Sequence, residues 1–131
     1  MSTEDFRFEV VEGWGFGPKG KVMGGVIPAV AVDSTGRVFL GRREPSAILV
    51  YSRQGEYLET WGEKEVANPH LLWIDSQDRV YAFQRQDQPV MVFDRDGKYL
   101  HCWGIGAITD PHGINIVDDV VYRKGVDADF I

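Results

Sequence analysis

Two histidines carry the clearest potential for chemistry in this chain, and they are separated by a fixed interval. His70 and His112 are 42 residues apart, and each directly follows a proline. Imidazole is a common zinc ligand, so equivalent histidines on neighbouring structural units would be placed to share a metal. Catalytic zinc needs three protein ligands and structural zinc needs four, so two histidines do not suffice. The alternative is that each histidine caps a loop and bonds a neighbouring carbonyl oxygen.

Two arginines recur at the same interval of 42 residues, Arg43 and Arg85. Each follows a run of β-forming residues. If the repeated units form a ring, a loop at this point would approach the mouth of the central channel. A guanidinium group there would clamp a carboxylate through two parallel hydrogen bonds. The alternative is a structural ion pair, for example with Glu44 or Asp87. The sequence leaves both interpretations open.

The interval belongs to a repeat that runs through most of the chain. Residues 33–39, Asp-Ser-Thr-Gly-Arg-Val-Phe, return at 75–81 as Asp-Ser-Gln-Asp-Arg-Val-Tyr, and residues 55–62 return at 97–104 with the same Trp-Gly ending. No insertion separates the two copies. Because self-similarity at a fixed period is the signature of a repeat architecture, the repeat decides the fold class.

Each copy is predicted to form four short strands in a meander. In the second copy the β-rich runs are 71–74, 79–83, 90–93 and 98–103. Aspartate and glycine lie between them, because aspartate bonds nearby amides and glycine reaches positive φ in hairpin turns. A unit of about 40 residues cannot bury both faces of its sheet alone, whereas radial stacking buries each sheet against the next, as in a β-propeller blade.

The chain is therefore expected to be a single all-β domain that holds part of a propeller. Its expected parts within residues 1–131 are a leading outer strand, two blades, the start of a third blade and an irregular tail, at 8–15, 28–62, 70–104, 111–122 and 123–131 respectively. A sheet that stops after two strands exposes an edge, which another chain would have to cover.

Several motifs together resemble NHL repeats: Val-Asp-Ser-X-X-Arg-Val-Tyr/Phe, Val-Phe-Asp-Arg-Asp-Gly-Lys-Tyr-Leu, Trp-Gly and Pro-His-Gly-Ile. Within that group, residues 8–122 are similar to the six-bladed propeller of the peptidyl-α-hydroxyglycine α-amidating lyase family, especially its bacterial relatives. The resemblance implies roughly half of a six-bladed NHL-type propeller with four-stranded antiparallel blades.

The resemblance also implies a chemistry. Enzymes of this family cleave a peptide that carries a C-terminal hydroxyglycine into a peptide amide and glyoxylate, with zinc on three histidines and calcium in the core. By position, His112 matches the first zinc histidine and Arg85 the catalytic arginine, while the backbone carbonyls of Leu72 and Ile114 match calcium positions. The implied activity is that of a carbon–nitrogen lyase, if the propeller is completed.

His70 and Arg43 are further candidates for the mouth of the channel. A small molecule or a peptide is the expected ligand. The alternative function is a noncatalytic NHL-repeat scaffold that binds a ligand or another protein. Bound zinc and turnover of a hydroxyglycyl peptide would separate the two functions.

Charge and apolar content narrow the range of expected partners and locations. The 20 acidic and 14 basic residues give a formal charge of −6, which offers nucleic acid no general attraction. No secretory signal and no run long enough to span a membrane is visible, so a cytoplasmic protein without membrane or nucleic-acid partners is expected. The single cysteine, Cys102, is expected to be a packing residue.

Assembly is the question that the repeat raises. The expected parts add up to about 11 strands, close to half of the roughly 24 that six four-stranded blades need. Two chains would nearly close one ring, with the leading strand of one chain completing the trailing sheet of the other. A homodimer is therefore one hypothesis, and a truncated product is the other.

Overall fold

The structure is a computed structural model that describes residues 5–21, 23–84, 88–108, 111–117 and 120–125, with the backbone alone described at 18, 111, 112 and 121–125. It is all-β, with ten strands among the described residues and a short 3₁₀ turn, η1 (Pro18–Gly20). No helix in these ranges is long and apolar enough to cross a membrane.

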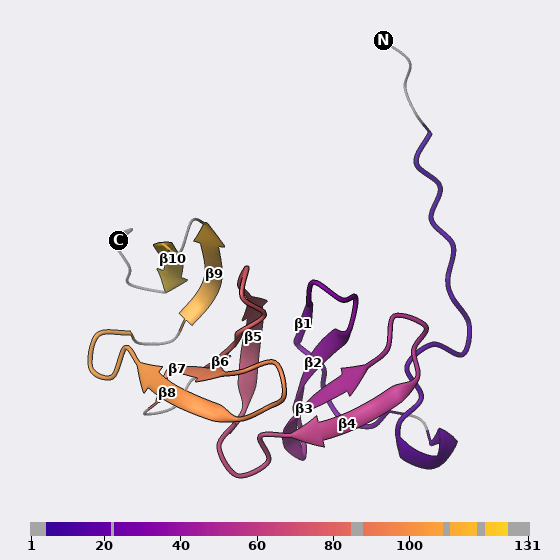
Figure 1. Ribbon diagram of the computed structural model, residues 1–131, viewed down its shortest axis with the longest axis horizontal. Coiled ribbons are helices and arrows are strands. Elements are labelled where there is room, and N and C mark those ends of the chain that lie inside the picture. The colour runs from indigo at the N-terminus through magenta and orange to yellow at the C-terminus, as the bar shows by residue number, and fades with distance from the viewer. Residues whose placement is uncertain (1–4, 22, 85–87, 109–110, 118–119, 126–131) are drawn as a thin grey trace.

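Two four-stranded antiparallel sheets form most of the molecule, as the repeat predicted. Figure 1 shows them side by side, each a meander in chain order. Sheet one consists of β1 (Ala29–Val32), β2 (Val38–Arg43), β3 (Ser46–Tyr51) and β4 (Tyr57–Trp61). Sheet two consists of β5 (Pro69–Ile74), β6 (Val80–Gln84), β7 (Val90–Phe93) and β8 (Tyr99–Trp103).

The two sheets share their register as well as their sequence. Tyr51 pairs with Tyr57 after a register shift at Val50, and Phe93 pairs with Tyr99 after the same shift at Val92. A bulge inserts one unpaired residue and increases the local twist, so a repeated bulge gives both sheets the same twist at this point. The 42-residue interval therefore holds at the level of hydrogen bonding.

A third sheet contains only two described strands, β9 (Pro111–Val117) and β10 (Val120–Gly125). The expected start of a third blade at 111–122 is thus a strand pair. The tail beginning at 123 was expected to be irregular, but β10 continues to Gly125, because Arg123 and Lys124 pair with Ile114 and Gly113. Residues 126–131 lie outside the described part of the chain.

The leading outer strand expected at 8–15 is not formed within the single chain. Residues 5–11 run as an extended arm and residues 12–15 form a turn (Figure 1). The alternation of apolar and charged residues is typical of a strand, but a strand also needs a neighbour to accept its hydrogen bonds. Among the described residues no strand pairs with residues 5–11.

Aspartates hold the turns between the first two strands of each sheet. The Oδ1 atom of Asp33 accepts bonds from the amides of Thr35 and Arg37, and Asp75 Oδ1 accepts from the amides of Gln77 and Arg79. The side-chain oxygens thus satisfy amides that the turn leaves free. Bonds to nearby amides are the role that the sequence predicts for aspartates in these turns.

The largest core cluster lies between the two four-stranded sheets. It joins Phe39 and Val50 of sheet one to Met91 and Phe93 of sheet two, all at most 1% exposed. Cys102 packs against this cluster, as predicted for a packing residue. A second cluster lies between sheet two and β9, and a third lies on the opposite face of sheet one.

Candidate functional site

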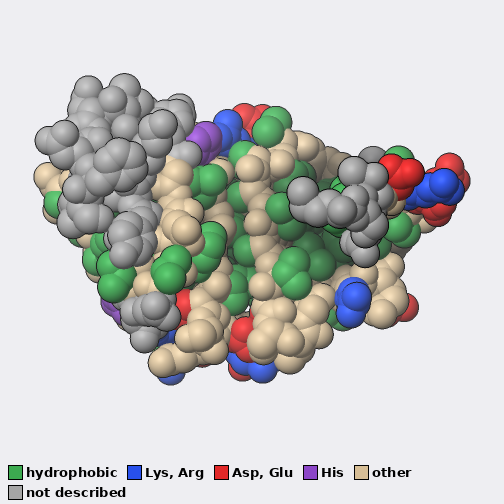
Figure 2. Space-filling model, turned by 90° about the horizontal axis from the view of Figure 1, so that it is seen from above, with side chains coloured by type: hydrophobic (Ala, Val, Ile, Leu, Met, Phe, Trp, Pro, Cys, Tyr) green, Lys and Arg blue, Asp and Glu red, His purple; other side chains and the backbone are tan. Residues whose placement is uncertain are grey.

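The first strands of the three sheets lie next to one another: β1 contacts β5, and β5 contacts β9. They line an open hollow of about 450 Å³. Its walls are apolar side chains from these three strands: Val30, Ala31, Val32, Leu71, Leu72, Trp73, Ile74 and Ile114. On the face seen in Figure 2, hydrophobic side chains gather across the middle and charged ones lie mostly towards the rim.

Arg43 and His70, which the sequence singled out separately, are in direct contact. The Arg43 Nη2 atom lies 2.6 Å from His70 Nδ1, and Arg43 Nε donates to the carbonyl oxygen of Pro69 at 3.3 Å. Both contacts bridge the end of β2 and the beginning of β5. The side chain of Leu71, the next residue of β5, already lines the hollow.

This contact assigns the tautomer of His70. A guanidinium group has hydrogen-bond donors and no acceptor, so Nδ1 of His70 must accept the bond and its proton must sit on Nε2. An Nδ1 lone pair that accepts a hydrogen bond is not available to a metal. His70 can therefore offer a metal only Nε2, after loss of the proton there, and its neutral ring serves here as a partner for Arg43.

The predicted alternative for Arg43, a structural role, has the better support, although not through Glu44. Two of its nitrogen atoms are used in bonds to sheet two, and no ion pair joins it to Glu44 in the described residues. A carboxylate clamp would need these same donors in parallel. Arg43 consequently acts as a link between the two sheets.

The residues that the lyase resemblance assigns are only partly described. Arg85 and its alternative partner Asp87 lie outside the described residues, and His112 is described by its backbone alone, as the second residue of β9. Leu72 and Ile114 both line the hollow, on the adjacent strands β5 and β9. The two residues predicted at calcium positions therefore face one shared space.

The described residues do not form a metal site by themselves. Within those ranges, no group of three His, Cys, Asp or Glu side chains lies close enough together to hold an ion. His70, the one candidate imidazole that is described, has one ring nitrogen bound to Arg43. The three ligands of catalytic zinc are thus not assembled from the described side chains.

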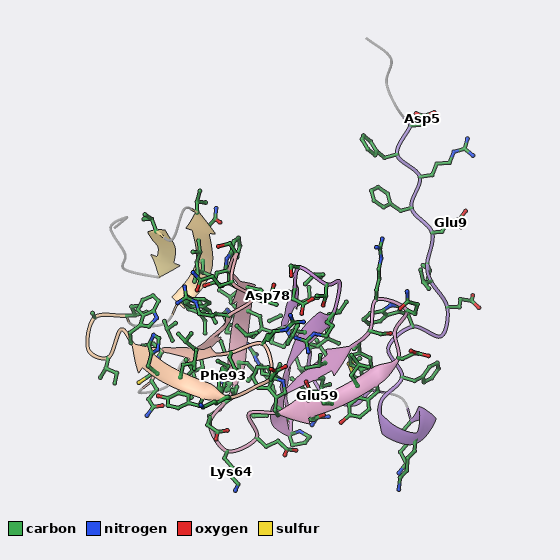
Figure 3. All side chains as sticks on the ribbon, in the orientation of Figure 1. Asp5, Glu9, Glu59, Lys64, Asp78 and Phe93 are labelled. Atoms are coloured by element: carbon green, nitrogen blue, oxygen red, sulfur yellow. The ribbon has the colours of Figure 1, made fainter. Side chains whose placement is uncertain are left out.

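Sequence reasoning missed a polar contact between the sheets, at the turn after β5. Asp78 accepts bonds from the amide and the hydroxyl of Ser34 at 2.8 and 2.6 Å. Arg37 of sheet one donates to the carbonyl oxygen of Arg95 in sheet two. Figure 3 shows Asp78 between the two sheets. A signal was present in the sequence, because Asp78 replaces Gly36 of the first copy and therefore departs from the repeat.

The turn carboxylates beside this contact are held in their charged form. Burial alone would raise the pKa of Asp33, but bonds from Arg37 and Thr35 outweigh it and leave the pKa below its ordinary value. Burial opposes ionisation of Asp75 as well, and bonds from Arg79, Gln77 and Tyr81 lower its pKa. Both carboxylates are saturated by these partners, which gives them a structural role.

Comparison with known proteins adds no assignment. No model of a protein family matches the sequence, and no curated protein matches it significantly. The resemblance to NHL repeats therefore remains a prediction from the motifs.

Proposed function

We propose that this chain is a repeat scaffold of the NHL-type β-propeller class that binds a small molecule or a peptide along its innermost strands. The observation that carries the proposal is the hollow between β1, β5 and β9. Apolar walls with a few polar groups at one end are typical of ligand sites. The bonded pair Arg43 and His70 lies at the start of β5, beside Leu71 of the wall.

The side chains that line the hollow indicate the polarity of its ligand. Val30 and Val32 of β1 are 62% and 57% exposed, although they are apolar. Trp73 of β5 adds an aromatic surface to the same hollow. Covering these side chains would contribute about 25 cal/mol for each Å² of apolar area removed from water. A ligand with one apolar face fits this surface better than a fully charged one.

The experiment uses the dye anilinonaphthalene sulfonate as an apolar probe, titrated against the 131-residue chain and followed by fluorescence. Val30→Glu places a charge in the hollow and should raise the Kd at least about tenfold, which corresponds to about 1.4 kcal/mol. Ile105→Glu is the matched control, since Ile105 is 63% exposed and lies outside the hollow. Equal affinity for both variants would contradict the proposal.

A lyase of the peptidyl-α-hydroxyglycine type is the second candidate, and the Arg43–His70 contact is the observation that favours it. Arg43 precedes His70 by 27 residues, and Arg85 precedes His112 by the same number. One repeat therefore already brings an arginine of one sheet against a histidine of the next. The second candidate brings Arg85 and His112 equally close, but with a substrate carboxylate and a metal in place of the arginine–histidine bond; their side chains lie outside the description.

In this candidate Arg85 would hold the substrate carboxylate, and His112 would be one zinc ligand among others. Bound zinc supplies Lewis-acid activation of a hydroxyl group. The carbonyl groups of Leu72 and Ile114 would contribute to a calcium site, as oxygen ligands that this ion accepts.

Metal content and turnover decide between the candidates. The lyase candidate predicts bound zinc by mass spectrometry and release of glyoxylate from a hydroxyglycyl peptide, both lost in His112→Ala. His70→Ala is the matched control at the equivalent position of the preceding repeat and should keep the metal. Absence of turnover with dye binding intact leaves the scaffold as the function.

A further inference from the structure

The two four-stranded sheets differ in what covers their equivalent faces. In sheet two, the side chains of Val80, Ala82, Met91 and Phe93 are buried under sheet one. The residues 42 positions earlier form the third core cluster, which packs against Trp14, Met23 and Ile27 and, within the described ranges, against no other sheet. We call these four residues of sheet one its leading face: Val38, Leu40, Leu49 and Tyr51.

The cover on the leading face is incomplete. An open hollow of about 250 Å³ remains there, lined by Leu49, Tyr51 and Met23 and rimmed by Lys19, Lys21 and Arg42. The buried hydroxyl group of Tyr51 has no hydrogen-bond partner among the residues that the structure describes. At the equivalent position of sheet two stands Phe93, fully buried beneath sheet one. The leading face thus has the composition of a sheet-to-sheet interface without the second sheet.

The position of Trp14 indicates which element would cover the leading face. A Cβ atom on Gly55 would lie 2.7 Å from the Trp14 ring, and a Cβ atom on Gly97 would lie 2.5 Å from the Trp61 ring. Both glycines have positive φ and allow an indole to lie on the turn. Trp61 is the last residue of β4, the outermost strand of the preceding sheet. Trp14 therefore holds the position of an outermost strand that precedes sheet one.

The arm that leads to Trp14 has the pattern of such a strand. Phe6, Phe8 and Val10 alternate with charged residues and are 79%, 92% and 89% exposed. Figure 3 shows the arm, with Asp5 and Glu9, standing away from the sheets. Exposed aromatic residues at a period of two are the signature of one face of a strand without its sheet.

At the other end of the described chain, the third sheet has two strands. β9 and β10 correspond to the first two strands of a four-stranded unit. Val117 and Val120, at the turn of this pair, are 48% and 50% exposed. Among the described residues no strand pairs with the outer edge of β10. An unpaired edge of this kind is a template for another chain.

We propose that a second copy of this chain docks head to tail. The β9–β10 pair of one copy, with the arm of the other copy as its outermost strand, forms the sheet that covers the leading face. Contacts between unlike surfaces of identical chains close into a ring when the rotation permits, and two copies then share two such interfaces. This inference rests on the stacked-repeat part of the proposed function and not on ligand binding.

Light scattering after size-exclusion chromatography tests the partner. The chain should elute with twice its mass of 14.8 kDa. The double variant Phe8→Asp, Val10→Asp should raise the Kd of the dimer at least about a hundredfold, since burying two charges at the interface is costly. Ile105→Asp, the same kind of change on another exposed apolar residue, should remain a dimer. Circular dichroism checks that each variant keeps its strands.

A photo-cross-link tests the site. Benzoylphenylalanine in place of Phe8 should give a cross-link between two chains, with the acceptor in the segment 113–125 of the other copy. The inference would be overturned by a monomer at all concentrations or by a dimer whose Kd the arm variant does not change. It would also be overturned by cross-links that stay within one chain's own sheets. Dye binding at the β1–β5–β9 hollow is read separately in the same variants, so the two proposals can fail independently.

Discussion

The two sheet-to-sheet junctions of this molecule are built from the same kinds of residue and differ in what they pack against. At the first junction, between sheets one and two, Phe93 and Val50 are fully buried and polar contacts such as Ser34–Asp78 add links. At the second, Phe83 and Val92 of sheet two are equally buried, but they face a sheet of two described strands. The two junctions therefore bury single residues equally and differ in the rigidity of the sheet that covers those residues.

The largest expected effect compares one phenylalanine from each junction. Phe93→Ala should cost about 4–5 kcal/mol of unfolding free energy, because two hydrogen-bonded four-stranded sheets cannot collapse around the cavity. Phe83→Ala should cost about 3 kcal/mol, at the low end for this substitution, because the two-stranded pair can move into the space. Urea unfolding of both variants measures the difference. Equal losses would mean that the β9–β10 pair is as rigid as a full sheet.

The second effect tests the tryptophan that crosses the first junction. Gly97→Ala should cost about 2–4 kcal/mol, since its Cβ atom would lie 2.5 Å from Trp61 and its φ of +84° disfavours a side chain. Gly106→Ala is the control: its φ is +74°, but no atom lies within 4 Å of the added Cβ atom. The control should lose only the backbone cost of about 1 kcal/mol. Thermal unfolding of the pair isolates the contact with Trp61.

The third effect concerns the carboxylates at the turns. The pKa of Asp33 and of Asp75 is lower in the folded chain than the ordinary value of 3.8, so the folded state binds protons less readily than the unfolded one. Their stabilisation should be complete above about pH 5 and should be lost as the pH falls through 3.8 towards the folded values.

Asp33→Asn and Asp75→Asn should flatten that acid dependence, and each should cost about 1.5–3 kcal/mol at neutral pH, the range for hydrogen bonds to charged groups. Asp5→Asn, on the exposed arm, serves as the control and should leave the profile unchanged. Urea midpoints measured across the acid range give the comparison. A parallel shift without flattening would show that other carboxylates dominate the acid response.

The smallest expected effect concerns Tyr51, whose equivalent in sheet two is Phe93. Tyr51→Phe should raise the unfolding free energy by about 1 kcal/mol, because it removes a buried hydroxyl group without a partner in the described part of the chain. Tyr57→Phe is the matched control and should lower the free energy by about the same amount, since its hydroxyl bonds Thr60 at 2.8 Å. A loss of stability in Tyr51→Phe would mean that the hydroxyl is satisfied in solution.

Part of the candidate site was accessible from the sequence. The interval of 42 residues identified Arg43 and His70 as special positions, yet it did not predict that they bond each other. Their chain separation is 27 residues, and only the placement of β5 beside the end of β2 brings them together. The same limit applies to Asp78, whose bond to Ser34 joins positions 44 residues apart.

By itself the sequence determined the repeat, the meanders and the Asp-Gly turns, because these depend on alternation, turn chemistry and bonds between near neighbours. The tertiary structure decided the rest. Residues 8–15 have the pattern of a strand and form none within the single chain, whereas β10 extends to Gly125 because β9 lies beside it. A strand exists only where a second one accepts its hydrogen bonds, and that neighbour is set by packing between distant parts of the chain.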